Sequence, residues 1–184
     1  MHAKHCGEVR QMGQDHRMAQ LHSAPHALRP AVPGDADGCA HVHHTSWVQT
    51  YSALLPASHW ETDTLERRAE TWRRWLEGGV AVTVAESGEL IVGFTIAGSG
   101  RQVGAHAPVR DRELYSLYVL AAHHGSGAGQ ALLEAVLPVG TPAQLWVAED
   151  NPRARRFYER NGFTPDGARF HDETLDLTEV RLVR

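Results

Sequence analysis

The residues best suited to chemistry begin in the stretch HHGSGAGQAL, residues 123–132, where three glycines alternate with small residues before an apolar helical pattern. Glycine in a helix interior costs about 0.5–1 kcal/mol relative to alanine, so the run suggests that the bare backbone itself is used. The first N–H groups of a helix have no partner within the helix and carry the positive end of its dipole. The stretch therefore predicts a phosphate-binding turn.

Two familiar nucleotide-binding loops do not fit this stretch. A Walker loop requires Gly-Lys-Ser/Thr, whereas Gly129 is followed by Gln130. A dinucleotide fingerprint that starts at Gly125 requires a glycine at its sixth position, which is again Gln130. A tight strand-to-helix turn packed by small residues is the plainer alternative, but one glycine would satisfy it.

A second stretch, NPRARRFYERNGF at residues 151–163, has the start and stop signals of a helix. Asn151 can cap it, Pro152 suits the first position, and Gly162 suits a left-handed end. Tyr158 falls on the apolar face of this helix, and packing in the core is the ordinary role for an aromatic residue there.

Hydrophobic periodicity predicts the elements that position these residues. The expected strands are 26–31, 80–87, 89–98, 113–120, 143–149, 168–171 and 180–183. The expected helices are 34–51, 62–78 (starting at Thr62 or Asp63), one from the glycine run to about 137, and 151–163. The order β-α-α-β-β-β-α-β-α-β-β indicates an α/β fold with a mixed sheet, in which a β-α-β unit at 113–148 forms a central parallel pair.

Composition narrows the function. The 184 residues suit a single domain over residues 25–184 after a loosely held extension over 1–24. A net charge of −4 argues against a nucleic-acid partner, and the absence of a long apolar run argues against a membrane span. Cys6 and Cys39 match neither a disulfide nor a zinc pattern, and the histidines near residue 43 lack a third ligand. We expect no metal and a cytoplasmic location.

Taken together, ELYSLYVLAAHHGSGAGQALL and the downstream LWVAEDNPRARRFYERNGF resemble the GNAT acetyltransferase superfamily. The resemblance implies that acetyl-CoA binds where the strand at 113–119 splays from the strand at 143–148. It implies that Leu117, Tyr118 and Val119 meet the pantetheine arm, with the backbone of Leu117 and Val119 pairing with it. The backbone amides implied to hold the pyrophosphate are those of His124, Gly125, Ser126, Gly127, Ala128 and Gly129. This sequence has His124 where the family usually has Gln or Arg, and Ala121 where a proline is usual.

The resemblance also implies roles in acyl transfer. Tyr158 matches the tyrosine beside the CoA sulfur and would be the general acid, while a backbone N–H near Val119 would stabilise the oxyanion. Asn151 would contact the pantetheine amide or order a water. Arg153, with the neighbouring arginines, would pair with the adenosine phosphate. Some members of the family carry a glutamate as the general base at the position where this chain has Trp146. Other members carry the base at the position of Glu113, so the resemblance implies that Glu113 is the base. An ordinary carboxylate at the end of a strand is the alternative interpretation of Glu113.

The segment HVHHTSWVQTYSALLP resembles the first helix of one GNAT subgroup. Trp47 and Tyr51 lie four residues apart, so they share a face and would bound an apolar or cationic acceptor, unless both simply pack in the core. We expect an acetyl-CoA-dependent N-acetyltransferase that acts on a primary amine, in a small molecule or a peptide. A non-catalytic acyl-CoA sensor and a protein N-acetyltransferase are the alternatives. Pairing of the last strands between two chains would make a homodimer.

Overall fold

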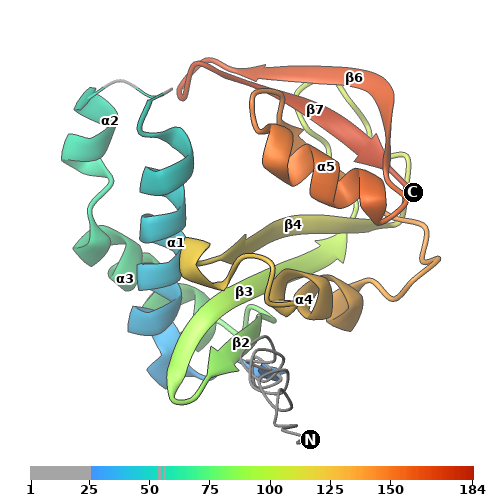
Figure 1. The fold of residues 1–184 in the computed structure, drawn as a ribbon. Helices are drawn as coiled ribbons and strands as arrows, with labels where there is room; N and C mark the ends of the chain where they lie inside the picture. The colour runs from blue at the N-terminus through green and yellow to red at the C-terminus, as the bar shows by residue number, and fades with distance from the viewer. Residues whose placement is uncertain (1–25, 54, 56) are drawn as a thin grey trace, which may run out of the picture.

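A computed structural model describes residues 26–53, 55 and 57–184. It contains a seven-stranded sheet in the order β1-β2-β3-β4-β5-β7-β6 (Figure 1). All neighbouring strands are antiparallel except β4 and β5, which are parallel. The predicted mixed sheet with a central parallel pair is therefore confirmed. The extension predicted for residues 1–24 lies outside the described residues.

The elements follow the predicted order with one addition. The strands are β1 (Ala27–Pro30), β2 (Thr83–Ser87), β3 (Leu90–Ser99), β4 (Arg112–Val119), β5 (Gln144–Ala148), β6 (Thr164–Asp172) and β7 (Leu177–Val183). The α-helices are α1 (Ala36–Tyr51), α2 (Ala57–Thr62), α3 (Leu65–Glu77), α4 (Ala128–Val136) and α5 (Pro152–Arg160). Short 3-10 turns occur at Pro33–Asp35 and Ala121–His123. The six-residue helix α2 was not predicted, and β6 and β7 are longer than predicted.

One predicted helix start is confirmed in position and another was wrong. Asp35 is the N-cap residue of α1, one of the two predicted positions, but its carboxylate binds Arg29 at 2.6 and 2.8 Å and makes no capping hydrogen bond to the helix. Helix α3 is capped by Thr64, whose hydroxyl accepts from the backbone N–H of Arg67, because Thr62 is the last residue of α2 and the Asp63 carboxylate binds the Arg68 guanidinium. The signals at α5 are confirmed: Asn151 caps it through Ala154 N–H, and Gly162 has φ +82°.

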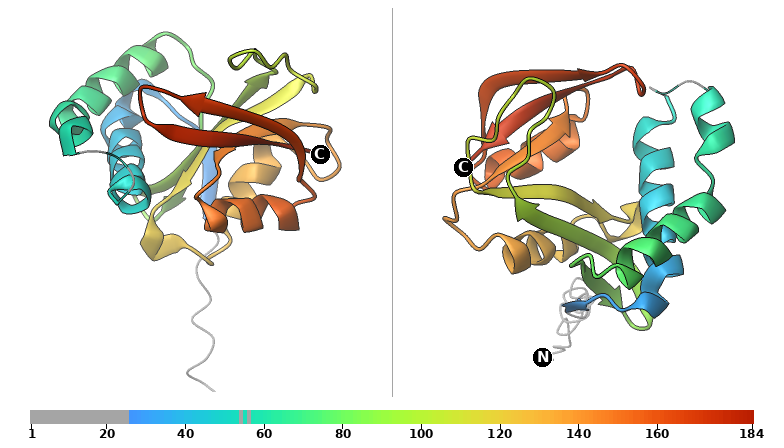
Figure 2. Two further views of the ribbon diagram at one scale, coloured as in Figure 1. Left: turned by 90° about the horizontal axis from the view of Figure 1, so that it is seen from above. Right: turned by 180° about the vertical axis from the view of Figure 1, so that it is seen from behind.

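Helices cover both faces of the sheet (Figures 1 and 2). On one face, α1 and α3 bury a core that includes Val42, Trp72 and Phe94. On the other face, Leu132 and Leu133 of α4 and Tyr158 of α5 pack on the strands. Burial of these apolar side chains is the main stabilising contribution. No helix among the described residues is long and apolar enough to cross a membrane.

The parallel pair at the centre of the sheet is short. β5 pairs with β4 only at Glu113–Gln144 and Leu114–Leu145. Immediately afterwards, the pairing of β4 with β3 skips Tyr115, which forms a β-bulge. A bulge bends its strand and increases its local twist. The two central strands therefore part beyond Leu114, and the predicted splayed pair is observed.

Candidate active site

The edge of β4 that faces β5 is open beyond the short parallel pair. On the opposite edge, the N–H of Leu120 donates to the carbonyl of Val92 on β3 at 2.9 Å. Backbone groups alternate in direction along a strand, so the N–H and C=O groups of Leu117 and Val119 point to the open edge. Unpaired backbone groups at such an edge are suited to bind an extended polar ligand as an added strand.

The glycine run makes a turn into α4 that leaves backbone N–H groups free. Gly125 and Gly127 have φ values of +80° and +92°, a region that favours glycine. The N–H groups of Gly125, Gly127, Gly129 and Gln130 donate to no other described residue. Their positions at and before the first turn of α4 match the requirements of an anion site, and a phosphate group fits this set of donors.

The intervening N–H groups are used within the turn. His124 N donates to Ala121 O at 3.1 Å, and Ser126 N donates to His123 O at 3.3 Å. Ala128 N is 3.4 Å from the Ser126 hydroxyl. Of the predicted amides from His124 to Gly129, only those of the three glycines are therefore free of described partners.

Two histidines fasten this turn to the sheet. His124 Nε2 donates to the carbonyl of Val119 at 2.8 Å, so this carbonyl is already engaged although it lies on the open edge. Ser126 donates to His123 O at 2.7 Å, so its hydroxyl accepts from His26 Nε2, also at 2.7 Å. His124 takes the position of the usual Gln or Arg but contacts the protein backbone. Burial lowers its pKa, and the nearby charge of Arg153 lowers it further.

The start of α5 lies close to the glycine turn. The charge of Arg153 contributes to the lowered pKa of His124, and the Phe157 ring of α5 lies 3.8 Å from the position of a Cβ built at Gly129. Asn151 uses its side-chain oxygen to cap α5 at 3.0 Å from Ala154 N. The Asn151 side chain also lies beside the Tyr51 hydroxyl, where its hydrogen bond opposes the upward shift of the Tyr51 pKa.

Three tyrosines from three elements approach one another where β4 and β5 part. Tyr158 packs in the core beneath α5, Tyr51 comes from α1 on the opposite face, and Tyr118 comes from β4. Burial raises the pKa of each, and Tyr51 raises the pKa of both Tyr118 and Tyr158 further. Tyr158 makes no side-chain hydrogen bond to another described residue. All three phenols are therefore neutral proton donors at neutral pH.

The predicted acceptor residues line the α1 side of this cluster. The Trp47 and Tyr51 rings are tilted by 52° to one another with centroids 4.9 Å apart, and Trp47 Nε1 donates to the Tyr118 hydroxyl at 2.8 Å. His43 lies 5.0 Å from the Tyr118 ring and accepts from Trp72 Nε1 at 3.3 Å. Burial lowers the pKa of His43 to about 3, with the nearby charge of Arg68 as the next cause. Trp47 and Tyr51 thus pack against other aromatic side chains of the protein, and Trp47 also contacts Tyr118 of the candidate site.

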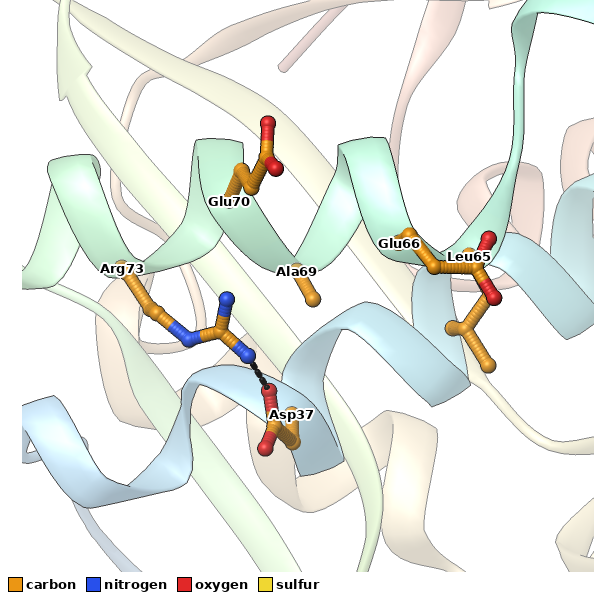
Figure 3. A pocket seen from close by; sticks show the side chains of 6 residues that line it. All are labelled: Asp37, Leu65, Glu66, Ala69, Glu70 and Arg73. Carbon is orange, nitrogen blue, oxygen red and sulfur yellow. Dashed lines mark hydrogen bonds and ion pairs between the residues drawn. The ribbon is translucent and has the colours of Figure 1, made fainter.

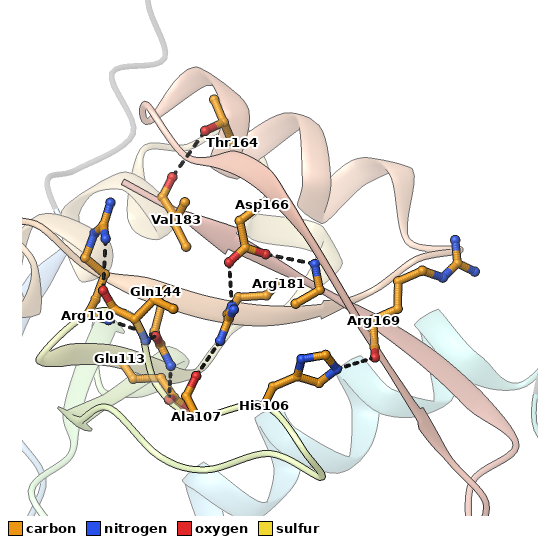
Figure 4. A network of polar contacts seen from close by, with 12 residues as sticks. His106, Ala107, Arg110, Glu113, Gln144, Thr164, Asp166, Arg169, Arg181 and Val183 are labelled. Carbon is orange, nitrogen blue, oxygen red and sulfur yellow. Dashed lines mark hydrogen bonds and ion pairs between the residues drawn. The ribbon is translucent and has the colours of Figure 1, made fainter.

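The predicted base, Glu113, is held in a buried network at the other end of β4 (Figure 4). Its carboxylate accepts from the backbone N–H of Arg101 at 2.9 Å and from two guanidinium nitrogens of Arg101 at 2.9 and 2.7 Å. It also accepts from the Gln144 amide at 2.8 Å. Its side chain is 1% exposed. A general base must reach the substrate or a water, so these contacts favour a positioning role for Glu113 at the first of the two β4–β5 pairs.

Sequence reasoning missed Glu179, a partly buried carboxylate of β7. It lies opposite Ala148 of β5 and Phe170 of β6. Burial raises its pKa, Asp172 and Glu113 raise it further, and Arg101 opposes them. Its charge also raises the pKa of Tyr51, whose ring packs in one cluster with Ala148 and Leu177. A lone Glu in a short terminal strand gave no signal, because only the strand order brings it to the centre of the sheet.

Other features of the surface lie away from this cluster. A hollow of about 280 Å³ is lined by Asp37, Leu65, Glu66, Ala69, Glu70 and Arg73 between α1 and α3 (Figure 3). Arg73 and Asp37 form an exposed ion pair across it at 2.7 Å, and none of its lining residues is a predicted site residue. Across residues 26–53, 55 and 57–184, no cluster of three or more His, Cys, Asp or Glu could hold a metal ion.

Comparison with known proteins gave a match to the family described as the acetyltransferase (GNAT) family over residues 43–163. An uncharacterized N-acetyltransferase of Bacillus subtilis (strain 168), YuaI, is 30% identical over 160 residues, which cover 84% of this chain and 87% of that protein. A probable N-acetyltransferase of Mycobacterium tuberculosis is 31% identical over 165 residues, covering 83% of this chain and 88% of that protein.

Solved structures share the fold. An acetyltransferase from Thermus thermophilus superposes with a TM-score of 0.61 at 26% identity, covering 89% of this chain and 99% of that one. The PaiA N-acetyltransferase from Thermoplasma acidophilum, solved in complex with coenzyme A, gives a TM-score of 0.58 at 18% identity, covering 86% and 98%. At that identity, the second likeness concerns the fold alone.

Proposed function

Because the chain belongs to the GNAT acetyltransferase family, we propose that it transfers the acetyl group of acetyl-CoA to a primary amine by direct attack of the amine on the thioester. The observation that carries this proposal is the coincidence of three features at one place. β4 and β5 part, free glycine N–H groups lie at the start of α4, and burial keeps the phenols of Tyr118 on β4 and Tyr158 on α5 neutral.

The donor would lie along the open edge of β4. The N–H and C=O of Leu117 would pair with the amides of the pantetheine arm, next to Tyr118, and the N–H of Val119 would follow along the same open edge, at the thioester end of the arm. The free N–H groups of Gly125, Gly127 and Gly129 would hold the pyrophosphate, within the turn that also contains His124, Ser126 and Ala128. Arg153 would meet the phosphates beside His124. Asn151 would fix the start of α5 and contact the arm near Tyr51.

This chain's own residues would serve each part of the acyl transfer. The Val119 N–H would donate to the carbonyl oxygen as it gains negative charge. Tyr158 would give its proton to the departing thiolate, a role suited to a phenol that burial keeps neutral. Trp47 and Tyr51 would border the acceptor. Glu113 would hold the ends of β4 and β5 together and so fix the place where the strands part.

The proposal is tested by two measurements on the full chain. Isothermal calorimetry should detect binding of coenzyme A, and a thiol-release assay with acetyl-CoA should detect turnover with primary amines. Absence of coenzyme A binding would overturn the proposal. Binding without turnover on any small amine or N-terminal peptide would instead favour a non-catalytic acyl-CoA sensor.

A further inference from the structure

The strand order places the Glu179 side chain on the face of the sheet that carries α1. Val180 and Leu182 belong to the core beneath α5, and neighbouring residues of a strand face opposite sides. Leu177, two residues before Glu179, packs with Tyr51 on the α1 side. Ala148, the register partner of Glu179 on β5, belongs to the same cluster. Glu179 therefore lies on the same face of the sheet as Tyr51, which it approaches from the β7 side.

The Glu179 carboxylate has no cation of its own among the described residues. No described group donates a hydrogen bond to it, whereas the arginines around it are engaged elsewhere. Arg101 binds Glu113 through two guanidinium nitrogens, and Arg181 binds Asp166 at 2.7 Å. The groups that act on Glu179 are Asp172 of β6, Glu113 of β4 and Arg101 of the β3–β4 connection, and Glu179 in turn acts on Tyr51 of α1. Of these three carboxylates only Glu113 is paired with Arg101, so Glu179 and Asp172 have no cationic partner among the described residues.

Aromatic side chains flank the Glu179 carboxylate on its face of the sheet, where the guanidinium of Arg181 lies over the Trp146 ring at 5.5 Å and His106 packs against the same ring at 5.6 Å. Phe170 lies opposite Glu179 on β6, and Trp146 lies diagonally on β5, since its register partner is Arg181. The Trp146 and Phe170 rings meet edge to face at 6.5 Å. With Leu177 and Tyr51 on the α1 side, the carboxylate is bordered by side chains that favour a hydrocarbon body attached to a cation.

We infer that Glu179 binds the ammonium group of the acceptor and accepts its proton, and that the acceptor is a monocationic primary amine with an apolar or aromatic body. This inference rests on the proposed function and adds the base and the substrate class to it. A substrate that also carries a carboxylate next to the amine is disfavoured, because a second anion would face Glu179 and Asp172.

The steps balance with the groups named. Glu179 takes one proton from the ammonium, which leaves a lone pair on nitrogen. That pair forms the C–N bond at the acetyl carbon, and the C–S bond breaks with its electron pair going to sulfur. Tyr158 protonates the sulfur, and the nitrogen returns its second proton to the phenolate. Glu179 releases its proton to water, so one amide, one thiol and one proton are formed from the ammonium and the thioester.

The test uses the full chain, acetyl-CoA and three probes: 2-phenylethylamine, butylamine and phenylalanine. We expect 2-phenylethylamine to be the best substrate and phenylalanine to be at least about tenfold poorer in kcat/KM. Glu179→Gln should lower kcat/KM for 2-phenylethylamine by about 10²-fold without changing the Kd for acetyl-CoA. Its pH–rate profile should lose the acid limb, which in the wild type lies above the ordinary carboxyl pKa because the pKa of Glu179 is raised.

The control is Asp176→Asn, which removes one negative charge from the same hairpin at a side chain that is 88% exposed. It should leave kcat/KM within twofold of wild type. If circular dichroism shows that Glu179→Gln is unfolded, Glu179→Asp takes its place, with a loss of at least tenfold expected because the carboxylate is withdrawn by one methylene.

The outcomes separate this inference from the proposed function. A Glu179 variant that keeps wild-type kcat/KM or the acid limb would overturn the role of Glu179. A wild-type chain that binds acetyl-CoA but acetylates none of the probes, or prefers phenylalanine, would overturn the substrate class and leave donor binding intact. A wild-type chain that does not bind acetyl-CoA would overturn the proposed function itself.

Discussion

Replacing Gly127 by alanine tests the use of the glycine turn directly. Gly127 has φ +92° and ψ −12° at the start of α4, and a Cβ built there meets nothing within 4 Å. The variant therefore causes no clash with the protein. It should cost about 1–2 kcal/mol of stability, because an L-residue disfavours positive φ. A methyl group beside the free N–H should also remove about 1.5–3 kcal/mol of charge-assisted hydrogen bonding to a phosphate oxygen.

The loss of hydrogen bonding to the phosphate is the effect that tests the site. It should appear as a loss of about 10- to 100-fold in the affinity for coenzyme A. Gly140 supplies a matched control, since it has φ +82° and an equally open Cβ position. It lies beyond the far end of α4, whose nine residues span about 13 Å. Gly140→Ala should lose similar stability and bind coenzyme A normally.

Calorimetric titration with coenzyme A and urea unfolding of each variant measure the two costs separately. If Gly127→Ala and Gly140→Ala unfold alike and bind coenzyme A alike, the bare backbone at Gly127 does not hold the pyrophosphate. The glycines would then serve only to turn the chain from β4 into α4.

Three further changes test other parts of the site. Tyr158→Phe should lower kcat by about 10²-fold and leave the Kd for acetyl-CoA unchanged, and unaltered turnover would rule out the general-acid role. Glu113→Gln should lower the free energy of unfolding by about 1–3 kcal/mol, because Arg101 loses its buried partner; loss of an acid limb in its pH–rate profile would instead restore Glu113 as the base. His43 has a folded-state pKa of about 3, against 6.5 when unfolded, so its contribution to stability is present above pH 6.5 and is lost as pH falls. At pH 5 the wild type should lose about 2 kcal/mol through this group, and His43→Gln, which can still accept from Trp72, should not; equal slopes of unfolding free energy against pH would contradict this.

Much of the fold could be predicted because its signals are local. The cap at Asn151 and the glycine at 162 mark both ends of α5, and the turn at Gly88, with φ +63°, joins β2 to β3. Helix α2 was missed because a six-residue element with one helical turn and a half has too little periodicity to detect. β6 was predicted too short because Pro165 and Gly167 lie in its first half, where the pairing with β7 is interrupted.

The candidate site was predictable only where its residues share a local motif. The glycine turn and Tyr158 each belong to a continuous stretch. The role of Glu113 depends instead on Arg101 and Gln144, which lie 12 and 31 residues away in the chain. The sequence indicated that Glu113 lies on the strand before the glycine turn. It did not indicate which groups surround the Glu113 carboxylate.

The position of the Glu179 carboxylate is determined by the order of the strands, which the sequence does not reveal. β7 inserts between β5 and β6 in the sheet, so the penultimate strand in space comes from the last strand in the chain. That insertion brings Glu179 beside Ala148, on the face of the sheet that carries Tyr51. β5 itself has Trp146 at the position where some members of the family have a glutamate base. Glu179 does not pair with Trp146, whose register partner is Arg181, but lies diagonally from it on the same face of the sheet. A base for the amine can therefore come from the strand next to β5 instead of from β5 itself. The direction of the Glu179 side chain on β7, toward the face of the sheet that carries α1, is consistent with the role inferred for it.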